Sequence, residues 1–373
     1  MHWSPPDHWQ KITVIDAHTG GEPLRIFTGG YPDLPGNTIL AKRRAALERF
    51  DFLRTATIWE PRGHADMYGC VVTEPVTPDG HFGVIFLHNE GYSSMCGHGI
   101  IAVTKVCLET GLIDLSGNPD QIKIDTPAGR VTATAKWEEG KVKEVSFLNV
   151  PSFVYTMDKT VFIPMLGEIR YDIAFGGAFY AFVRAEDADV ELTEKGFRRL
   201  IELGRSIKHA VAASIEIRHP FEADLGFLYG VIFVGKAYDS NNHSRNVCVF
   251  ADGEVDRSPT GTGVSARAAL HYARRELTLN QLFVVESILG SCFTGEVIEE
   301  IKFGQYNAVI PKISGSAHIC GINTLLIDPA ISRASAGQFT AQEKQLRQSK
   351  RSTVRTPSLS IIIAFSGHRD RHR

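Results

Sequence analysis

Two glycine-rich turns lie in the two halves of this chain, and each leads directly into a stretch with apolar residues at helical spacing. The turns are residues 94–99 (SMCGHG) and 257–263 (RSPTGTG). Each places a small polar side chain, Cys96 or Thr260, at the start of an expected helix, where unpaired N–H groups and the helix dipole favour negative charge. Two such helix starts that face each other would form a cleft able to bind an anion and to move a proton.

The expected elements around the two turns occur in the same order in both halves. Each half begins with two strands separated by a glycine pair, Gly20-Gly21 or Gly176-Gly177, and continues with a helix, strands and the helix after the glycine-rich turn. This repeat predicts an α+β fold of two pseudo-symmetric domains, residues 11–160 with Cys96 and residues 161–329 with Thr260. Helices are expected at residues 40–53, 100–111, 197–212 and 264–277, and further strands at 57–60, 70–74, 83–88, 121–125, 130–137, 145–150, 227–234, 247–251, 281–287, 293–303 and 306–313.

The composition is that of a globular protein large enough for two domains, with 373 residues, 43% of them hydrophobic and 22% charged. The net charge of −2 gives no electrostatic reason to bind nucleic acid. No run approaches the roughly 18 apolar residues of a membrane-spanning helix, and the first ten residues lack the apolar core of a signal peptide. The six cysteines are scattered without a CxxC pair, which indicates a reducing compartment, so a cytoplasmic protein is expected.

The C-terminal segment, residues 330–373, differs from the rest of the chain. It loses clear periodicity, and nine Lys and Arg residues face only two acidic ones. A solvated, disordered extension is the favoured interpretation, and a basic interaction tail is the alternative.

Cys96 is the candidate reactive group. The other cysteines lie in apolar or strand-like sequence and are expected in the core, whereas a helix start lowers the pKa of a thiol. Metal binding by Cys96 and His98 is disfavoured, because residues two apart on a helix start diverge and no third ligand is evident. A nucleophilic cysteine needs an adjacent imidazole, for which His98 is too near in sequence, although a remote histidine stays open. A role as base is favoured because it also uses the second turn.

Thr260 occupies the position that matches Cys96, but its hydroxyl is not a base at neutral pH, so a symmetric exchange between two thiolates is excluded. A simple helix N-cap is the alternative for Thr260. Asp256 either accepts a hydrogen bond from a substrate ammonium group or forms a turn with Ser258, and His98 either holds a carboxylate or is a buried imidazole. Backbone N–H groups for an anion would come from Gly97, Gly261 and Thr262.

Three further segments are dense in polar residues beside expected strands: residues 18–22 (HTGGE), 60–64 (EPRGH) and 88–92 (HNEGY). Each is equally compatible with a scaffold turn and with a pocket wall. The sequence alone does not decide between the two.

Several long motifs together resemble the proline racemase family, over about residues 12–328. They are HTGGEPLRI (18–26), EPRGHADMYG (60–69), HNEGYSSMCGHG (88–99), FGGAFYAFV (175–183) and DRSPTGTG (256–263). The resemblance implies the diaminopimelate-epimerase-like fold, with two similar α+β domains, the active site in the cleft between them, and neither a metal nor another cofactor. The segment after residue 329 matches nothing in this family.

The resemblance also implies roles for single residues. Racemases and epimerases of the family have a second motif like DRSPCGTG, whereas its dehydratases keep the first cysteine and have threonine at the position of Thr260. Cys96 would then be the base, and the carboxylate and ring nitrogen of an imino-acid substrate would be bound by Gly97, His98, Asp256, Gly261 and Thr262.

The expected reaction is removal of water from trans-3-hydroxy-L-proline, which gives Δ1-pyrroline-2-carboxylate. Thr260 would orient the leaving hydroxyl, directly or through a water, and the acid that protonates it is not identified. Racemisation or epimerisation of proline or 4-hydroxyproline, and binding of an amino acid without turnover, are the alternatives. Neither a nucleic acid nor a membrane is expected as partner, and a homodimer stays open.

Overall fold

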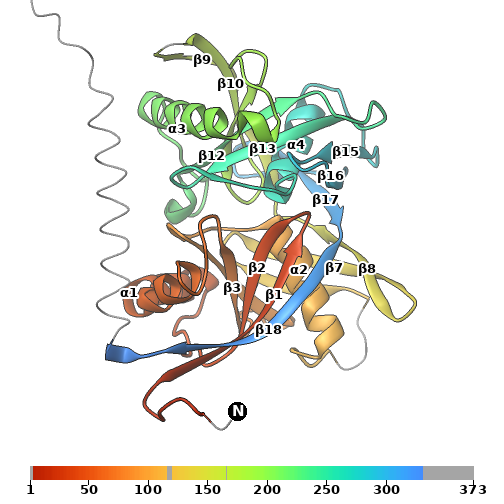
Figure 1. Ribbon diagram of the computed structural model, residues 1–373. Coiled ribbons are helices and arrows are strands. Elements are labelled where there is room, and N and C mark those ends of the chain that lie inside the picture. The colour runs from red at the N-terminus through yellow and green to blue at the C-terminus, as the bar shows by residue number, and fades with distance from the viewer. Residues whose placement is uncertain (1–2, 116–119, 165, 331–373) are drawn as a thin grey trace, which may run out of the picture.

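The computed structural model describes residues 3–115, 120–164 and 166–330, which form two lobes of strands and helices (Figure 1). The first half of the chain contains β1 (Gln10–Thr19), β2 (Glu22–Gly29), α1 (Ile39–Ile58), β3 (Tyr68–Thr73), β4 (Phe82–His88), β5 (Gly91–Tyr92), α2 (Gly97–Thr110), β6 (Ile122–Thr126), β7 (Gly129–Glu138) and β8 (Lys141–Leu148). The second half contains β9 (Ser152–Ile163), β10 (Gly167–Phe175), β11 (Phe179–Arg184), η1 (Glu194–Gly196), α3 (Phe197–Ser214), η2 (Ala223–Leu225), β12 (Leu228–Gly235), β13 (Ser244–Phe250), β14 (Glu254–Val255), α4 (Gly261–Ala273), β15 (Phe283–Glu286), β16 (Cys292–Phe303), β17 (Tyr306–Gly315) and β18 (Ala317–Ile327). The segment expected to be disordered lies, from residue 331 onward, outside the described residues.

The two halves pair their strands in the same pattern. In the first, β1 and β2 form an antiparallel hairpin, β2 runs parallel to β3 across α1, β3 is antiparallel to β4, and β4 runs parallel to β6 across α2. The second half repeats these pairings with β10, β11, β12, β13 and β15 around α3 and α4. Parallel neighbours need a crossover connection, and each helix supplies one. The predicted pseudo-symmetric α+β fold is confirmed.

β9 falls mostly within the predicted first domain, residues 11–160, and β18 falls within the predicted second domain, residues 161–329, and each pairs with the first strand of the other domain. β9 is antiparallel to β10, and β18 runs antiparallel along β1. In addition, β8 pairs with β17, so hydrogen bonds connect all the strands of the two lobes. The expected domain boundaries did not include this exchange, since residue 160 lies inside β9 and β18 lies in the lobe of β1 (Figure 1). The division at residues 160 and 329 therefore stays a prediction.

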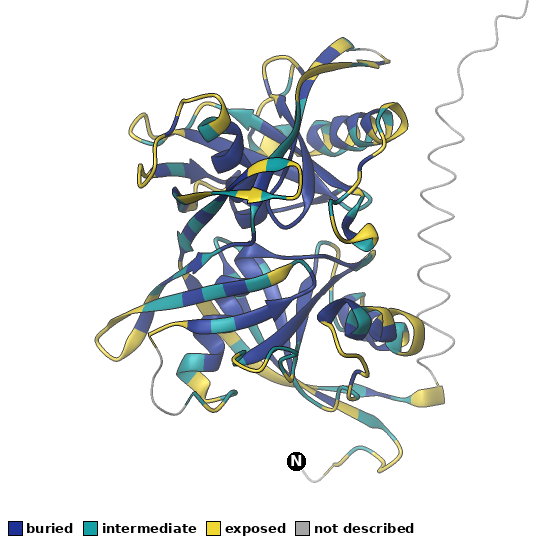
Figure 2. Ribbon diagram, turned by 180° about the vertical axis from the view of Figure 1, so that it is seen from behind, coloured by how far each residue is buried: buried dark blue, intermediate teal, exposed yellow. Residues whose placement is uncertain are grey.

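Each lobe has one central and one outer helix. The central helices are α2, which contacts β1, β8 and β18, and α4, which contacts β9, β10, β16 and β17. Residues 97–107 of α2 and 261–270 of α4 are buried without a break, as expected for a helix enclosed on all sides. Figure 2 shows the buried residues inside both lobes and the exposed ones mainly on loops and outer elements.

The strand expected at residues 57–60 is wrong, because α1 continues to Ile58. Thr57 and Ile58 are β-branched and favour strands. However, Ile58 is fully buried, and the Thr57 hydroxyl donates to the Leu53 carbonyl one helical turn earlier, at 2.6 Å. Tertiary packing therefore overrides local propensity at this position. Among the described residues, no helix is long and apolar enough to cross a membrane.

Candidate active site

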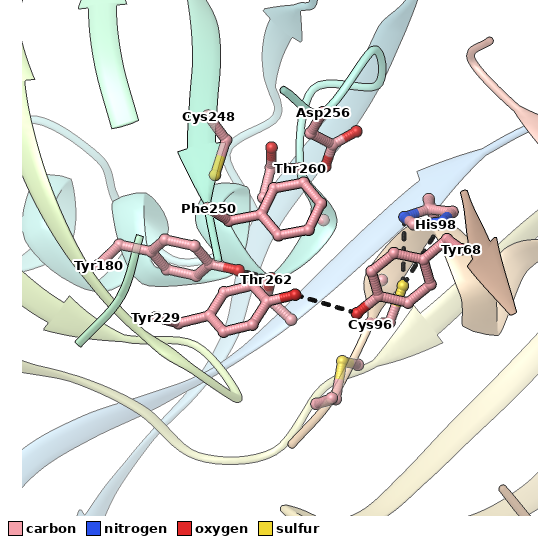
Figure 3. Close-up of a pocket in the computed structure, with 13 residues that line it drawn as sticks. Tyr68, Cys96, His98, Tyr180, Tyr229, Cys248, Phe250, Asp256, Thr260 and Thr262 are labelled. Carbon is pink, nitrogen blue, oxygen red and sulfur yellow. Dashed lines mark hydrogen bonds between the residues drawn. The ribbon is translucent and has the colours of Figure 1, made fainter. Parts of the chain in front are cut away.

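A small cavity lies between the starts of α2 and α4 (Figure 3). All the candidate residues that the sequence singles out line it, from both halves of the chain: Cys96, Gly97, His98, Asp256, Thr260, Gly261 and Thr262. The remaining lining residues are Tyr68, Met95, Tyr180, Tyr229, Cys248 and Phe250. The two glycine-rich turns thus meet at one site.

The two helix starts touch through their glycines. A Cβ atom on Gly97 would lie 2.5 Å from the Cα of Gly261, and one on Gly261 would lie 2.8 Å from the Cα of Gly97. Both distances are far below van der Waals contact, so neither position has room for a side chain. The free N–H groups of both helices consequently converge on the same cavity, where an anion would be favoured.

The glycine pair of each half supports the glycine-rich turn of the other half. The Gly177 carbonyl accepts a hydrogen bond from the Ser94 hydroxyl at 2.6 Å, and a Cβ on Gly177 would lie 2.9 Å from the Cβ of Met95. On the other side of the cavity, the Glu22 carboxyl group beside Gly21 accepts a hydrogen bond from the Arg257 N–H at 2.8 Å. This reciprocal packing fixes both turns against each other.

Cys96 is the N-cap of α2 and is 4% exposed. Its Sγ accepts a hydrogen bond from the Gly99 N–H at 3.2 Å and lies 3.1 Å from His98 Nδ1. The expectation that Cys96 and His98 diverge is wrong, because the N-cap has extended backbone and turns its side chain back over the first helical turn.

The pKa of the Cys96 thiol also differs from the expectation. Burial raises it well above its usual value, and the nearby carboxyl groups of Asp256 and Glu22 add to the increase, against the opposing Gly99 hydrogen bond. Burial likewise lowers the pKa of His98, so its imidazole is neutral at physiological pH. In the closed cavity the thiol therefore keeps its proton until a positive charge enters.

Thr260 has a left-handed backbone, with φ of +66°. This conformation is strained for a β-branched residue, and strained residues of this kind cluster at functional sites. Its hydroxyl does not cap α4, and Thr260 Oγ1 is buried without a hydrogen-bond partner among the described residues. The Cys248 thiol lies beside it on the same wall (Figure 3). An unpaired buried hydroxyl that borders a cavity is available to a ligand.

Asp256 combines the two roles that the sequence left open. One carboxylate oxygen accepts a hydrogen bond from the Ser258 N–H at 2.7 Å, which shapes the turn, and the residue also lines the cavity. Glu22 is fully buried nearby, and burial, followed by the charge of Asp256, raises the pKa of Glu22 well above its usual value. Burial beside Asp256 therefore favours the neutral form of the Glu22 carboxyl group.

Sequence reasoning missed three tyrosines that line the cavity. The Tyr68 hydroxyl donates to the Ser93 hydroxyl at 2.6 Å and lies 3.2 Å from the Tyr229 hydroxyl, while the Tyr180 hydroxyl lies 2.7 Å from Thr262 Oγ1. Tyr68 begins β3, and the other two lie within β11 and β12, where aromatic residues are ordinary strand formers. The sequence signal was the position of Tyr68 near the end of the motif of residues 60–69.

The three polar segments at residues 18–22, 60–64 and 88–92 contribute no residue to the cavity wall. Asn89, for example, accepts a hydrogen bond from the Met67 N–H at 2.9 Å and donates to the His64 carbonyl at 3.0 Å. These segments therefore support the scaffold. Within the part of the chain that the structure describes, no group of three or more His, Cys, Asp or Glu residues could hold a metal ion.

Two similar α+β lobes with a cavity between their central helix starts define the diaminopimelate-epimerase-like class of enzyme folds. The chain belongs to the proline racemase family, whose model matches residues 14–331.

Two relatives and one solved structure illustrate the similarity. The trans-3-hydroxy-L-proline dehydratase of Colwellia psychrerythraea is 49% identical over 322 residues, which cover 86% of this chain and 91% of that protein. The 3-hydroxyproline 2-epimerase of Burkholderia multivorans is 43% identical over 319 residues, which cover 86% and 95%. A crystal structure of a hydroxyproline epimerase from Agrobacterium vitis, with bound trans-4-OH-L-proline, has 29% identity and a TM-score of 0.81 over 89% of this chain and 96% of that chain.

Proposed function

We propose that this chain is a trans-3-hydroxy-L-proline dehydratase that forms Δ1-pyrroline-2-carboxylate without a cofactor. The observation that carries the proposal is the pairing of Cys96 at the start of α2 with Thr260 at the start of α4 around one cavity. The relative with 49% identity has this dehydratase activity as its name, which supports the same assignment.

The substrate would bind as a zwitterion. Its carboxylate fits the converging N–H groups of the two helix starts, including Gly97, Gly261 and Thr262, and its ring ammonium fits the carboxylate of Asp256. The ammonium charge offsets the burial and the nearby carboxyl groups that raise the pKa of Cys96. Substrate binding would thus favour the thiolate when it is needed, while His98 lies against the sulfur at 3.1 Å.

The Cys96 thiolate would then remove the α-proton. The electrons of the C–H bond form a double bond between C2 and C3 as the C3–O bond breaks and water leaves, and the resulting enamine tautomerises to the imine. The helix starts stabilise the charge that develops on the carboxylate. Inversion at the α-carbon needs a proton donor on the opposite face, and a threonine hydroxyl at Thr260 replaces the second thiol there.

The test is turnover of the purified full-length chain with the isomers of 3- and 4-hydroxyproline and with proline, followed by imine formation and by optical rotation. We expect imine from trans-3-hydroxy-L-proline and no inversion of the other compounds. Cys96→Ser should lower kcat by at least about 100-fold, the lower range for loss of a general base. Cys292→Ser is the matched control, because Cys292 is exposed at the start of β16 and does not line the cavity.

Two results would point elsewhere. Inversion of proline or 4-hydroxyproline without imine formation would favour an epimerase. Epimerisation is the second candidate function because one relative is named 3-hydroxyproline 2-epimerase. Binding of hydroxyproline without turnover of any isomer would indicate an inactive homologue. The six cysteines are free thiols, which agrees with a reducing compartment, and we place the protein in the cytoplasm.

A further inference from the structure

The stereochemistry of the proposed substrate fixes the side from which water must leave. In trans-3-hydroxy-L-proline the hydroxyl and the carboxylate lie on opposite faces of the ring. The α-proton is also opposite the carboxylate, because both are attached to C2, so the α-proton and the 3-hydroxyl lie on the same face. A base that removes the proton therefore stands on the face from which the hydroxyl departs, and the acid must reach that face too.

The residues on the two sides of the cavity come from different halves of the chain. Cys96 and His98 at the start of α2, together with Tyr68 at the start of β3, belong to the first half. Thr260 and Cys248 form the wall contributed by the second half (Figure 3). For a ring held between these two sides, with Cys96 as the base, Thr260 would lie on the face opposite the leaving hydroxyl.

Tyr68 brings a hydroxyl to the side of Cys96. The residue is 3% exposed and lines the cavity, its ring contacts the His98 ring edge-to-face with centroids 4.9 Å apart, and its hydroxyl is near enough to the Cys96 thiol to lower the pKa of that thiol. The same hydroxyl donates to the Ser93 hydroxyl at 2.6 Å and lies 3.2 Å from the Tyr229 hydroxyl. The phenol is thus oriented by neighbours on two sides, close to the sulfur.

We propose that Tyr68 is the acid that protonates the leaving hydroxyl. The base that acts on the C2–H bond and the acid that acts on the C3–O bond then lie on the same wall of the cavity. This inference rests on the proposed dehydratase function. It assigns Tyr68 as a catalytic residue and leaves Thr260 to contact the opposite face of the ring.

The proton transfers balance without any further reactant. The α-proton moves to the Cys96 sulfur, the C2–H electrons form the C2–C3 double bond, and the C3–O bond breaks as the Tyr68 proton passes to the departing oxygen. Water and a tyrosinate result. Because the tyrosinate lies beside the newly protonated thiol, the proton then passes from sulfur to oxygen, which restores the thiolate and the phenol for the next turnover.

The electrostatics of the cavity agree with these roles. Burial raises the pKa of Tyr68 well above its usual value, so the phenol holds its proton until a stronger base, the departing hydroxide, appears. Burial lowers the pKa of His98, and the Nδ1 atom of its neutral ring is 3.1 Å from the Cys96 sulfur. His98 is therefore placed to orient the base, whereas Tyr68 has a proton to give.

The experiment compares Tyr68→Phe with the unaltered enzyme on two substrates that differ only in the leaving group. One is trans-3-hydroxy-L-proline, and the other is trans-3-fluoro-L-proline, in which fluoride leaves as a stable anion that needs no acid. For the hydroxy substrate, Tyr68→Phe should lower kcat by at least about 100-fold, as is typical for loss of a general acid. For the fluoro substrate, fluoride release should stay within about threefold of the unaltered enzyme, since Cys96 still removes the α-proton.

The fluoro substrate also reports that the variant is folded and binds normally. Tyr171→Phe is the matched control, because Tyr171 is buried and its hydroxyl lies 3.4 Å from Ser214 Oγ, outside the cavity lining. It should leave both rates unchanged. Full activity of Tyr68→Phe on the hydroxy substrate would overturn the proposal and assign the proton to Cys96 or His98. An equal decrease of kcat on both substrates would overturn it as well, since Tyr68 would then act by positioning Cys96 or by packing in the cavity wall. An unaltered enzyme that forms no imine would instead refute the dehydratase function itself.

Discussion

The contact between the two helix starts makes Gly97→Ala a sensitive test of how the site is assembled. The new Cβ would lie 2.5 Å from the Gly261 Cα, 2.9 Å from the Gly261 carbonyl carbon and 3.1 Å from the Thr262 nitrogen. All three are backbone atoms, so no side chain can turn away to make room. Carbon atoms need about 3.5–4.0 Å, and α2 and α4 must therefore separate by about 1 Å.

That displacement has two expected consequences. Overpacking of a buried contact costs about 1–3 kcal/mol of unfolding free energy. A misplacement of about 1 Å between groups that act together costs on the order of 100-fold in rate. We therefore expect kcat/KM for trans-3-hydroxy-L-proline to fall by about 100-fold, with a smaller fractional loss of stability.

The assay pairs steady-state imine formation with chemical denaturation of the same preparations. Gly321→Ala is the control, because a Cβ at this position on β18 would meet only the Asn323 side chain, at 3.8 Å. Its activity and stability should stay close to those of the unaltered chain. If Gly97→Ala retained full kcat/KM, the argument that the two helix starts jointly form the anion site would be refuted.

Three further predictions concern the second wall, the base and the scaffold. Thr260→Cys should gain inversion at the α-carbon that is measurable by polarimetry, in an assay with a reductant because the Cys248 thiol is adjacent. Absence of inversion in the reduced protein would show that a thiol at this position is not sufficient for inversion. Because burial raises the pKa of Cys96, kcat/KM should increase with pH as the thiol ionises, and a flat pH–rate profile from pH 6 to 9 would contradict this. Glu286→Gln should lower the unfolding free energy by about 3–5 kcal/mol, because it leaves Arg245, which is 2% exposed and 2.6 Å from Glu286, as an unpaired buried charge. Burial opposes ionisation of Glu286, but hydrogen bonds lower its pKa to about 2. The contribution of Glu286 to the unfolding free energy is therefore present above pH 4.5 and is lost as the pH falls toward 2. Acid unfolding of Glu286→Gln should lack this loss of stability.

The glycine-rich turns were readable from the sequence because their geometry is local. A helix start needs no distant partner, and the repeat of elements around Cys96 and Thr260 predicts two similar lobes whose helices meet. The exchange of β9 and β18 was not readable, because pairing of β18 with β1 joins residues from opposite ends of the described chain. Strand propensity identifies a strand but not its neighbour.

The electrostatics of the site were misread for a similar reason. A helix start does lower the pKa of an exposed thiol, and the Gly99 N–H has this effect on Cys96. The larger effect is burial, which comes from residues such as Tyr68 and Phe250 on strands far away in the sequence. Only the folded cavity shows which of the two effects dominates.

Inversion and elimination require different chemical groups on the two walls of the cavity. Inversion moves a proton off one face of the α-carbon and returns a proton to the other, so both helix starts must carry a group that can exchange one. Loss of water from a trans-3-hydroxy substrate breaks the C–H and C–O bonds on a single face, where Cys96 and Tyr68 are neighbours. The start of α4 then needs to bind the carboxylate through its N–H groups but needs no thiol at the position that matches Cys96, and the strained Thr260, whose hydroxyl has no partner among the described residues, meets the second condition. On this reasoning, a threonine at the second turn and a phenol beside the first cysteine both suit elimination rather than inversion.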